Sequence, residues 1–446
     1  MESQIKTYPY PNGEIQRVQL VRWEDWDKLD FLSMAPTKDT LDCFSAIYRN
    51  FLVPAAPWLF GNMILFRLPE DAAVPFPLET EKYGAVASSL TAAAAALEAG
   101  VRFTLSGRPR FRSRETEEFW RELESRDCIR IVRGKLPITT VIPLGNLPGY
   151  MTKTEEHAAM KVNAPFFIMD RFDCATLYDH VGTPLGLRVK DGIVQAPPQY
   201  GREALLVSRE GKVEIRSLDV GDLNLEIGGK LFIPGKNADI YTRPQAFRAP
   251  RGKNLVIVGD RVAAVKDGSV PVPASGFVLR VREGLQVKPG DPVTYRGLEH
   301  IRFGIQVGNS ILRDGKKTDR FISKFYNIKA LEPVPYPPSL YPMDFARARA
   351  ARIALGADRE GKPMLLWAEG AAKFGYEAGK GSCGASLKEM AEICADLGFE
   401  NAVNLDGGGS AQILLNNRRS LLISDRRKED CSEAERPVPL GLVIRE

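Results

Sequence analysis

The sequence has few of the residues that build metal sites and disulfide scaffolds. Its 446 residues include three histidines and six cysteines, and no two cysteines form a C-x-x-C pair. This spacing fits neither a zinc site nor a disulfide-dense scaffold. No Walker-type or Rossmann glycine motif accompanies the strands expected in the first 125 residues, so no nucleotide site is indicated there. We therefore expect no cofactor, although the acidic residues discussed below leave a divalent cation open.

The chain also lacks strong net charge and long hydrophobic runs. A net charge of +5 is small for this length and implies no attraction to nucleic acid or membranes. The apolar stretch 51–66 is interrupted by Pro54, Pro57, Gly61 and Asn62, so we expect no membrane span. The first seven residues are polar and charged, and no signal peptide is visible. We predict a soluble, cytoplasmic protein without a nucleic-acid partner, and the sequence leaves its oligomeric state open.

The order of the expected elements predicts two domains. At 44% hydrophobic and 26% charged residues, the composition is that of a globular protein with ample core. Helices expected at 39–51, 85–99 and 115–125 alternate with strands expected at 63–68, 101–105 and 128–132, which favours a small α/β domain over residues 1–125, of unknown role. Strands dominate from residue 136, with hairpins expected at Asp191-Gly192, Glu210-Gly211 and Asp267-Gly268. We therefore expect residues 126–446 to form an α+β, strand-rich domain with few helices.

The most informative stretch runs from Val403 to Ser410. A short apolar strand pattern ends in Asn404 and Asp406, and three glycines and a serine follow. Consecutive glycines indicate positive φ angles or a close approach of the backbone to another group. Their N–H groups can form an anion-binding concavity. A tight glycine turn between two strands is the alternative interpretation.

The neighbouring residues predict the elements around this loop. Ser386 and Glu389 form a capping box, and apolar residues follow at helical spacing until Gly398, a typical helix C-terminal glycine. Residues 401–405 then have the pattern of a buried strand. Strands are expected at 411–415 and 420–423, joined by a turn at Asn416-Asn417. Ser382, Asp406 and Ser410 would thus lie in loops at the ends of elements, where functional sites usually occur.

Several of these segments, in this order, resemble the phosphodiester glycosidase family. The resemblance covers roughly residues 126–446. It rests on Asn-Ala-Pro-Phe-Phe at 163–167, Gly-Thr-Pro-Leu-Gly-Leu at 182–187, Arg-Ile-Ala-Leu-Gly at 352–356, Ser-Cys-Gly-Ala-Ser-Leu at 382–387, Asn-Leu-Asp-Gly-Gly-Gly-Ser at 404–410 and Arg-Pro-Val-Pro at 436–439.

The chain departs from the family pattern in one important place. Where the family usually has Asp-Gly-Arg after an apolar strand, this chain has Glu369-Gly370-Ala371. The carboxylate is retained with one more methylene, but the arginine is missing. Its loss removes a bidentate phosphate partner that a lysine replaces only in part. Pro165 and Ile353 are smaller departures, at positions where the family has glycine and threonine.

The resemblance implies a hydrolase that cleaves the glycosidic C–O bond of a sugar-1-phosphodiester, in glycan or glycopolymer metabolism. A phosphate monoester is a good leaving group, so the reaction depends less on a general acid than ordinary glycoside hydrolysis does. The reaction still needs a phosphate cradle and a carboxylate. The resemblance suggests three catalytic residues, Asp406, Glu369 and Arg352. The substrate-binding candidates are Asn163, Phe167, Ser382, Gly384, Asn404, Gly407, Gly408, Gly409 and Ser410.

Several questions remain open from the sequence. It does not decide which carboxylate is the base. A non-catalytic carbohydrate- or glycopolymer-binding protein on the same fold is one alternative. An enzyme of a different reaction, such as phosphodiester or polysaccharide processing, is another.

Three structural expectations follow. Asp406, Ser410, Arg352, Glu369, Asn163 and Ser382 should meet in one cleft. Residues 1–125 should contribute little to that cleft. Finally, at least one of the three glycines should have positive φ, with the N–H groups of the loop facing an open cleft.

Overall fold

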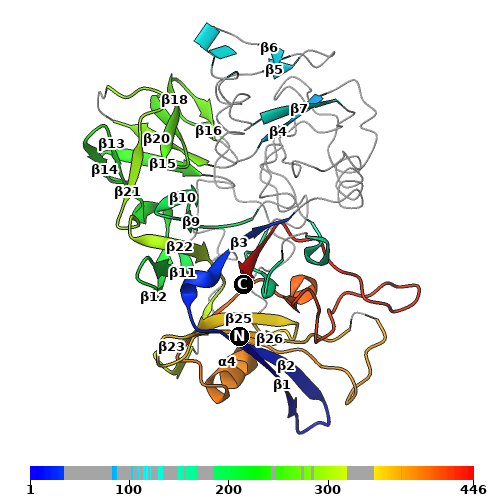
Figure 1. The fold of residues 1–446 in the computed structure, drawn as a ribbon. Coiled ribbons are helices and arrows are strands. Elements are labelled where there is room, and N and C mark those ends of the chain that lie inside the picture. The colour runs from blue at the N-terminus through cyan, green and yellow to red at the C-terminus, as the bar shows by residue number, and fades with distance from the viewer. Residues whose placement is uncertain are drawn as a thin grey trace.

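The structure is a computed structural model. It describes residues 1–34, 83–87, 102–103, 109–110, 114–115, 117–118, 121, 129–133, 149–154, 157–167, 184–199, 201–242, 248–272, 276–282, 286–318, 346–372 and 374–445. The described part is α+β and strand-rich, as predicted, and Figure 1 shows its arrangement.

A seven-stranded antiparallel sheet forms the base of the fold. Its strand order is β1-β2-β26-β25-β27-β23-β24. The strands are β1 (Glu2–Pro9), β2 (Ile15–Arg22), β26 (Pro363–Ala368), β25 (Arg352–Ala357), β27 (Asn401–Asn404), β23 (Ser310–Arg313) and β24 (Lys316–Lys317). Segments from both ends of the chain therefore meet in one sheet.

The main hydrophobic core lies on one face of this sheet. A four-stranded sheet packs there, with the order β28 (Ile413–Leu415), β8 (Met160–Asn163), β29 (Leu440–Ile444) and β3 (Leu29–Ser33). Trp367 of β26 is fully buried in this core, together with Ile353, Val403 and Leu442.

The other face of the seven-stranded sheet is covered by α4 (Leu387–Asp396). Leu387, Met390 and Cys394 of the helix pack against Leu366 and Ala354 of the sheet. Ser386 caps the helix reciprocally with Glu389, and Gly398 follows the helix with φ +86°. The predicted helix and its capping box are therefore confirmed.

Smaller sheets form the middle of the chain. One has the order β10 (Ile193–Ala196), β9 (Arg188–Lys190), β22 (Ile301–Gln306), β11 (Arg202–Ser208), β12 (Val213–Leu218). A second has β14 (Lys230–Phe232), β13 (Asn224–Ile227) and β21 (Val293–Arg296). A third has β15 (Ala238–Thr242), β20 (Gly276–Val281), β17 (Lys253–Val258) and β18 (Arg261–Asp267), and β16 (Arg248–Ala249) pairs with β19 (Val270–Pro271). The first three of these sheets share a second core that includes Phe232, Phe277 and Tyr295.

Two predicted hairpins are confirmed and two other strand predictions are wrong. Asp191-Gly192 joins β9 to β10, and Gly211 lies in the turn between β11 and β12. The turn at Asp267-Gly268 instead leads from β18 to β19, which pairs with β16, because β18 already pairs with β17. Residues 420–423 form no strand, although Leu421 and Ile423 are buried. The N–H groups of residues 422 and 423 donate instead to the side-chain carboxylates of Glu369 and Glu433.

The expected separate unit over residues 1–125 is wrong for residues 2–33. β2 pairs with β26, and β3 pairs with β29, so both strands belong to the sheets that carry the family-like segments. Residues 85–87, expected in a helix, lie in strand β4 (Tyr83–Ala87), which pairs with β7 (Ile129–Arg133). The short strands β5 (Arg102–Phe103) and β6 (Pro109–Arg110) also pair. The other elements expected before residue 125 lie mostly outside the described residues, and a domain there stays a prediction.

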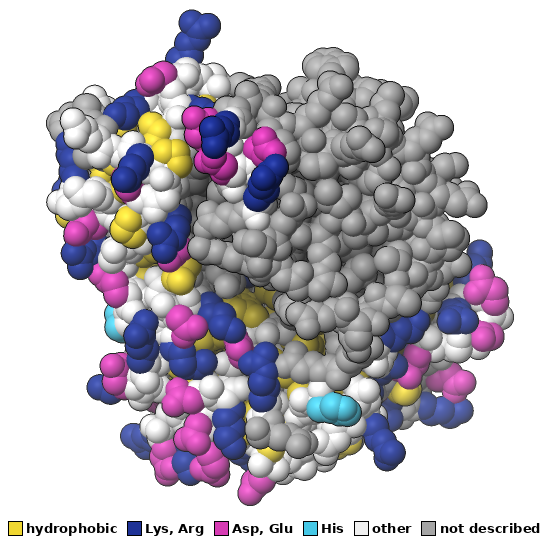
Figure 2. Space-filling model, turned by 45° about the horizontal axis from the view of Figure 1, so that its top comes forward, with side chains coloured by type: hydrophobic (Ala, Val, Ile, Leu, Met, Phe, Trp, Pro, Cys, Tyr) yellow, Lys and Arg dark blue, Asp and Glu magenta, His cyan; other side chains and the backbone are white. Residues whose placement is uncertain are grey.

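Charges of both signs are mixed over the described surface. On the face shown in Figure 2, Lys and Arg side chains are interspersed with Asp and Glu. This agrees with the small net charge of +5. Any selectivity for a charged ligand must therefore come from the local placement of side chains.

Candidate functional site

Four charged residues lie at one end of the seven-stranded sheet. Arg352 begins β25 opposite Ala368, and Glu369 follows Ala368 directly. Val18 also lies opposite Ala368, which places Arg17 of β2 next to Glu369. Asp406 follows β27, whose Asn404 pairs with Ala354. The antiparallel register thus brings two carboxylates and two guanidinium groups to the same sheet end, although their sequence positions are far apart.

Glu369 is a buried carboxylate, with 2% of the residue exposed, that accepts three hydrogen bonds. Arg17 donates from Nε to Oε2 at 2.7 Å, and the Leu422 N–H donates to Oε1 at 2.8 Å. The Ser382 hydroxyl donates to Oε2 and accepts the Arg17 N–H at 3.0 Å. The negative charge of Glu369 is therefore compensated and its orientation is fixed.

A cavity of about 370 Å³ opens beside this carboxylate. Its walls include Arg17, Glu369, Ser382, Tyr376, Lys380 and Arg426. Glu369 and Ser382, both predicted from the sequence, are thus placed at an accessible cavity of a size suited to a small ligand.

Asp406 lies in the loop after β27 and is 7% exposed. Burial raises the pKa of its carboxyl to about 6, against weaker lowering effects of Ser410, Arg436, the Gly407 N–H and Arg352. The Gly407 N–H donates to Oδ1 at 2.9 Å, whereas Oδ2 has no hydrogen-bond partner among the described residues. The Ser410 hydroxyl lies near enough to favour the ionised carboxylate, but its Oγ lacks hydrogen-bond geometry with any described residue. Asp406 therefore changes its protonation near neutral pH.

The glycine loop uses its N–H groups within the protein. The Gly407 N–H binds the Asp406 carboxylate, the Gly408 N–H donates to the Ala351 carbonyl at 2.8 Å, and the Ser410 N–H donates to the Gly407 carbonyl at 3.2 Å. Gly408 has φ +58°, which confirms the positive φ that we predicted. The predicted anion cradle is wrong for these three N–H groups, because each of them is already hydrogen-bonded within the protein.

Close packing explains why Gly370, Gly407 and Gly409 carry no side chain. A β-carbon on Gly407 would lie 2.6 Å from the Ala351 carbonyl oxygen, and one on Gly370 would lie 2.6 Å from the Ala351 nitrogen. A β-carbon on Gly409 would collide with the ion pair between Arg436 and Asp425, whose Nη2–Oδ2 distance is 2.8 Å. The Ala351 backbone therefore leaves no space for a side chain at position 407, and this ion pair leaves none at position 409.

Asn163 and Arg352, two other candidates from the sequence, bond backbone groups and do not line the cavity. Asn163 donates to the Asp406 carbonyl at 2.9 Å and accepts the Gln412 N–H at 3.0 Å, so both ends of its amide are used. Arg352 donates to the carbonyls of Ala385 and Ala348, at 3.1 and 2.8 Å.

The last three candidates differ in their surroundings. Phe167 packs in a small core and pairs with Pro184. Gly384 has φ +81° and lies against the Ala350 backbone. The amide of Asn404 is buried and has no hydrogen-bond partner among the described residues.

The predicted cleft is thus only partly observed. Asn163 and Arg352 do lie beside the Gly407–Gly409 backbone, and Ala351 touches both Gly370 and Gly407, so the candidates gather in one region. Within that region, however, Glu369 and Ser382 line the cavity, and the Asp406 loop does not.

Arg17 is the site residue that the sequence did not reveal. It lies in a segment that we had assigned to a separate domain, and the local sequence around it carries no motif. Only the pairing of β2 with β26, over 340 positions away, brings it to Glu369. A strand pattern at 15–22 was the one available signal, and it does not specify a partner strand.

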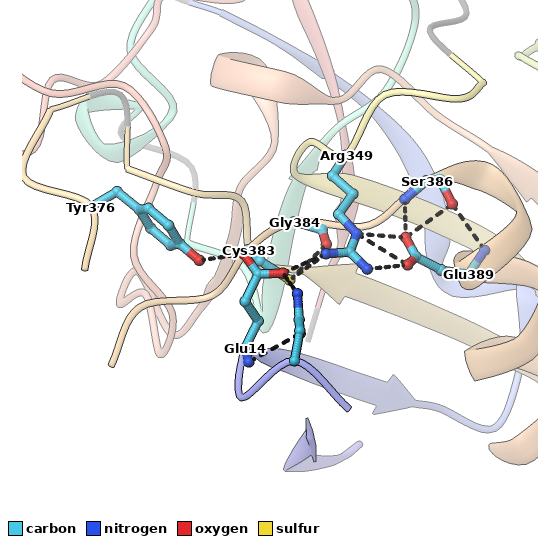
Figure 3. A network of polar contacts seen from close by, with 8 residues as sticks. Glu14, Arg349, Tyr376, Cys383, Gly384, Ser386 and Glu389 are labelled. Atoms are coloured by element: carbon cyan, nitrogen blue, oxygen red, sulfur yellow. Dashed lines mark hydrogen bonds and ion pairs between the residues drawn. The ribbon is translucent and has the colours of Figure 1, made fainter. Parts of the chain in front are cut away.

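A polar network around Arg349 fixes the backbone segment next to Ser382 (Figure 3). Arg349 donates to Glu389 and Glu14, each at 2.7 Å, and to the Cys383 sulfur at 3.6 Å. Burial disfavours the Glu389 carboxylate, but its bonds to Arg349 and Ser386 outweigh this and hold its pKa below the usual value. The network therefore ties the β1–β2 turn to the start of α4, with the Ser382 segment between them.

The described residues offer neither a metal-binding cluster nor a membrane-spanning helix. No group of three or more His, Cys, Asp and Glu side chains lies within reach of a common metal ion there. No helix in the same part of the chain is long and apolar enough to cross a membrane.

Part of the chain is similar to known proteins. A family model described as phosphodiester glycosidase matches residues 237–445. The N-acetylglucosamine-1-phosphodiester alpha-N-acetylglucosaminidases of Mus musculus and Homo sapiens are 34% and 33% identical over 102 residues, which are 23% of this chain and 18% of each relative. The chain thus spans less than a fifth of the length of these curated relatives.

Solved structures give weaker likenesses. The catalytic domain of the zebrafish enzyme, described as auto-inhibited by its pro-peptide, is 17% identical, with 68% of each chain covered and a TM-score of 0.36. A hypothetical protein from Synechocystis is 14% identical, with 99% of this chain and 61% of that chain covered and a TM-score of 0.43. Residues 237–445, slightly less than half of the chain, thus match the phosphodiester glycosidase family model.

Proposed function

We propose that the protein hydrolyses the glycosidic C–O bond of a sugar-1-phosphodiester that binds in the cavity beside Glu369. The observation that carries this proposal is a buried carboxylate, oriented by Arg17, Ser382 and the Leu422 N–H, at the wall of a cavity of about 370 Å³. The family match supports the reaction class.

The reaction needs only a few groups from the protein. The bond between the anomeric carbon and the phosphate oxygen breaks, the phosphate monoester leaves with the bonding electrons, and water adds to the carbon. A carboxylate that faces the sugar stabilises the oxocarbenium-like carbon or accepts the proton of that water. Glu369 suits this direct role because it lines the cavity and keeps its orientation.

Asp406 suits a supporting role in this scheme. It is separated from Glu369 by strand β25, so the two strand ends lie about 10 Å apart, or two strand spacings. Its side chain is buried under the glycine loop and does not line the cavity. We propose that Asp406 acts through the shape and charge of the loop rather than by contact with the substrate.

The test is hydrolysis of a panel of sugar-1-phosphodiesters by the wild type and by Glu369→Gln. The variant keeps the size of the side chain and should lower turnover by about 10²–10⁴-fold, the usual contribution of a positioned acid–base group. Glu226→Gln is the matched control, because Glu226 also pairs with an arginine, Arg296, but lies on β13 away from the cavity.

Two results would contradict the proposal. One is binding of these compounds by the wild type without release of sugar, which supports the alternative of a carbohydrate-binding protein. The other is unchanged turnover in Glu369→Gln.

A further inference from the structure

We propose that Arg17 and Arg426 form a two-arginine phosphate site in the cavity beside Glu369. The inference deepens the proposed function, because it assigns the groups that would hold the phosphate of the substrate. It concerns binding alone, however, and can be tested without turnover.

Arg17 presents half of its guanidinium group to the cavity. Its Nε is bonded to Glu369 at 2.7 Å, and a third of its side chain is exposed. Its two Nη atoms have no hydrogen-bond partner among the described residues, and Arg17 lines the cavity. A guanidinium with its Nε fixed and both terminal nitrogens available is pre-organised to bind an anion.

Arg426 faces the same cavity from the segment after Leu422. Its Nη1 donates to the backbone carbonyls of Ile423 and Asp425, which fixes the side chain. Nε and Nη2 have no hydrogen-bond partner within the described part of the chain. The turn that follows is closed by backbone bonds from Arg427 to Ser432, at 2.8 Å, and from Cys431 to Arg427, at 3.0 Å.

The charges around the cavity favour an anion at these two side chains. Lys380 also lines the cavity, but Glu377 neutralises it at 2.6 Å. The carboxylate of Glu369 repels a bound phosphate. The phosphate is therefore favoured on the Nη side of Arg17, where the guanidinium group lies between the phosphate and the carboxylate. Arg17 and Arg426 then have four unpaired nitrogens, which match the several acceptor oxygens of a phosphate.

This arrangement also accounts for the departure at position 371. The family resemblance leads us to expect an arginine there, immediately after the carboxylate, and this chain has alanine. Arg17 reaches the same carboxylate from the neighbouring strand β2. The N-terminal hairpin of this chain would thus supply the cation that the sequence lacks at residue 371.

The experiment measures the binding of inorganic phosphate to the full-length protein by isothermal titration calorimetry. Arg17→Lys keeps a positive charge beside Glu369 but loses the planar, multiple N–H donors of the guanidinium group. Arg426→Gln removes the second guanidinium group. We expect each variant to bind phosphate about 10- to 100-fold more weakly, the effect of losing one or two charge-assisted hydrogen bonds. Melting temperatures close to that of the wild type would show that both variants are folded.

Two controls match the changed residues in position. Arg22 lies at the other end of β2 and donates to the Leu397 carbonyl, and Arg427 is the exposed neighbour of Arg426. Neither lines the cavity, so Arg22→Gln and Arg427→Gln should change phosphate affinity less than twofold. Cys431 lines the cavity, and bound phosphate should slow its alkylation in the wild type.

The outcomes separate this inference from the proposed function. A wild type that binds no phosphate at millimolar concentration, or wild-type affinity in either Arg17→Lys or Arg426→Gln, would overturn the two-arginine site even if the protein hydrolyses sugar phosphodiesters. Conversely, weakened phosphate binding in both variants supports the site even if no hydrolysis is found.

Discussion

Asp406→Asn should make the folded protein more stable at neutral and alkaline pH. Burial raises the pKa of Asp406 from 3.8 to about 6. A carboxyl with a raised folded-state pKa stabilises the fold fully below pH 3.8, and this contribution is lost as the pH rises through 6. Raising the pKa by this amount means that, above pH 7, the ionised carboxylate destabilises the folded protein by about 3 kcal/mol.

Asparagine cannot ionise and therefore avoids this penalty. Its Oδ1 can still accept the Gly407 N–H, but its new NH2 group takes the place of Oδ2, which has no partner among the described residues. An unsatisfied buried donor costs about 1–3 kcal/mol. We therefore expect a net gain of up to about 2 kcal/mol at pH 8 and none at pH 4.

The assay is thermal denaturation of both proteins at matched pH values from 4 to 8. Comparison at each pH cancels the titration of every other group. The difference in melting temperature should grow in favour of the variant through pH 6. A difference that stays constant with pH, or that favours the wild type more at pH 8 than at pH 4, would refute the burial argument.

Three further predictions concern stability and reactivity. Arg349→Met should lower the urea midpoint of unfolding, because it leaves the carboxylates of Glu14 and Glu389 without their cation. An unchanged urea midpoint would show that the network contributes nothing. Gly409→Ala should lower the melting temperature more than Gly408→Ala, because the methyl group at position 409 would collide with an ion pair. The methyl group at position 408 would meet open space and would cost only the strain of a positive φ, about 1–2 kcal/mol. The reverse order of melting temperatures would contradict this packing. In the native protein, iodoacetamide should modify the exposed Cys431 but not Cys394, whose thiol pKa is raised by burial; equal labelling in peptide maps would show that the core opens readily.

Local signals in the sequence predicted the elements around the site well. The capping box at Ser386 and the terminal Gly398 fix the ends of α4, because these signals act within one or two helical turns. The Asp191-Gly192 hairpin is similarly local, since both residues adopt the positive φ that its turn requires.

The sequence alone does not predict contacts between residues that are far apart in the chain. Arg17 belongs to the site only because β2 pairs with β26, and a strand pattern does not name its partner. The sequence predicts an anion cradle in the glycine loop because the N–H groups of consecutive glycines can bind an anion. They bind Asp406, the Ala351 carbonyl and the Gly407 carbonyl, which only the tertiary structure brings into place.

The central claim is that the protein cleaves the bond between sugar carbon and phosphate oxygen. Hydrolysis of a sugar-1-phosphodiester in oxygen-18 water tests it directly, with the products followed by phosphorus NMR and mass spectrometry. We predict that the label enters the free sugar, that the phosphate monoester stays unlabelled, and that Glu369→Gln suppresses both products. Label in the phosphate would show cleavage of the P–O bond, and the protein would then be a phosphodiesterase rather than a glycosidase.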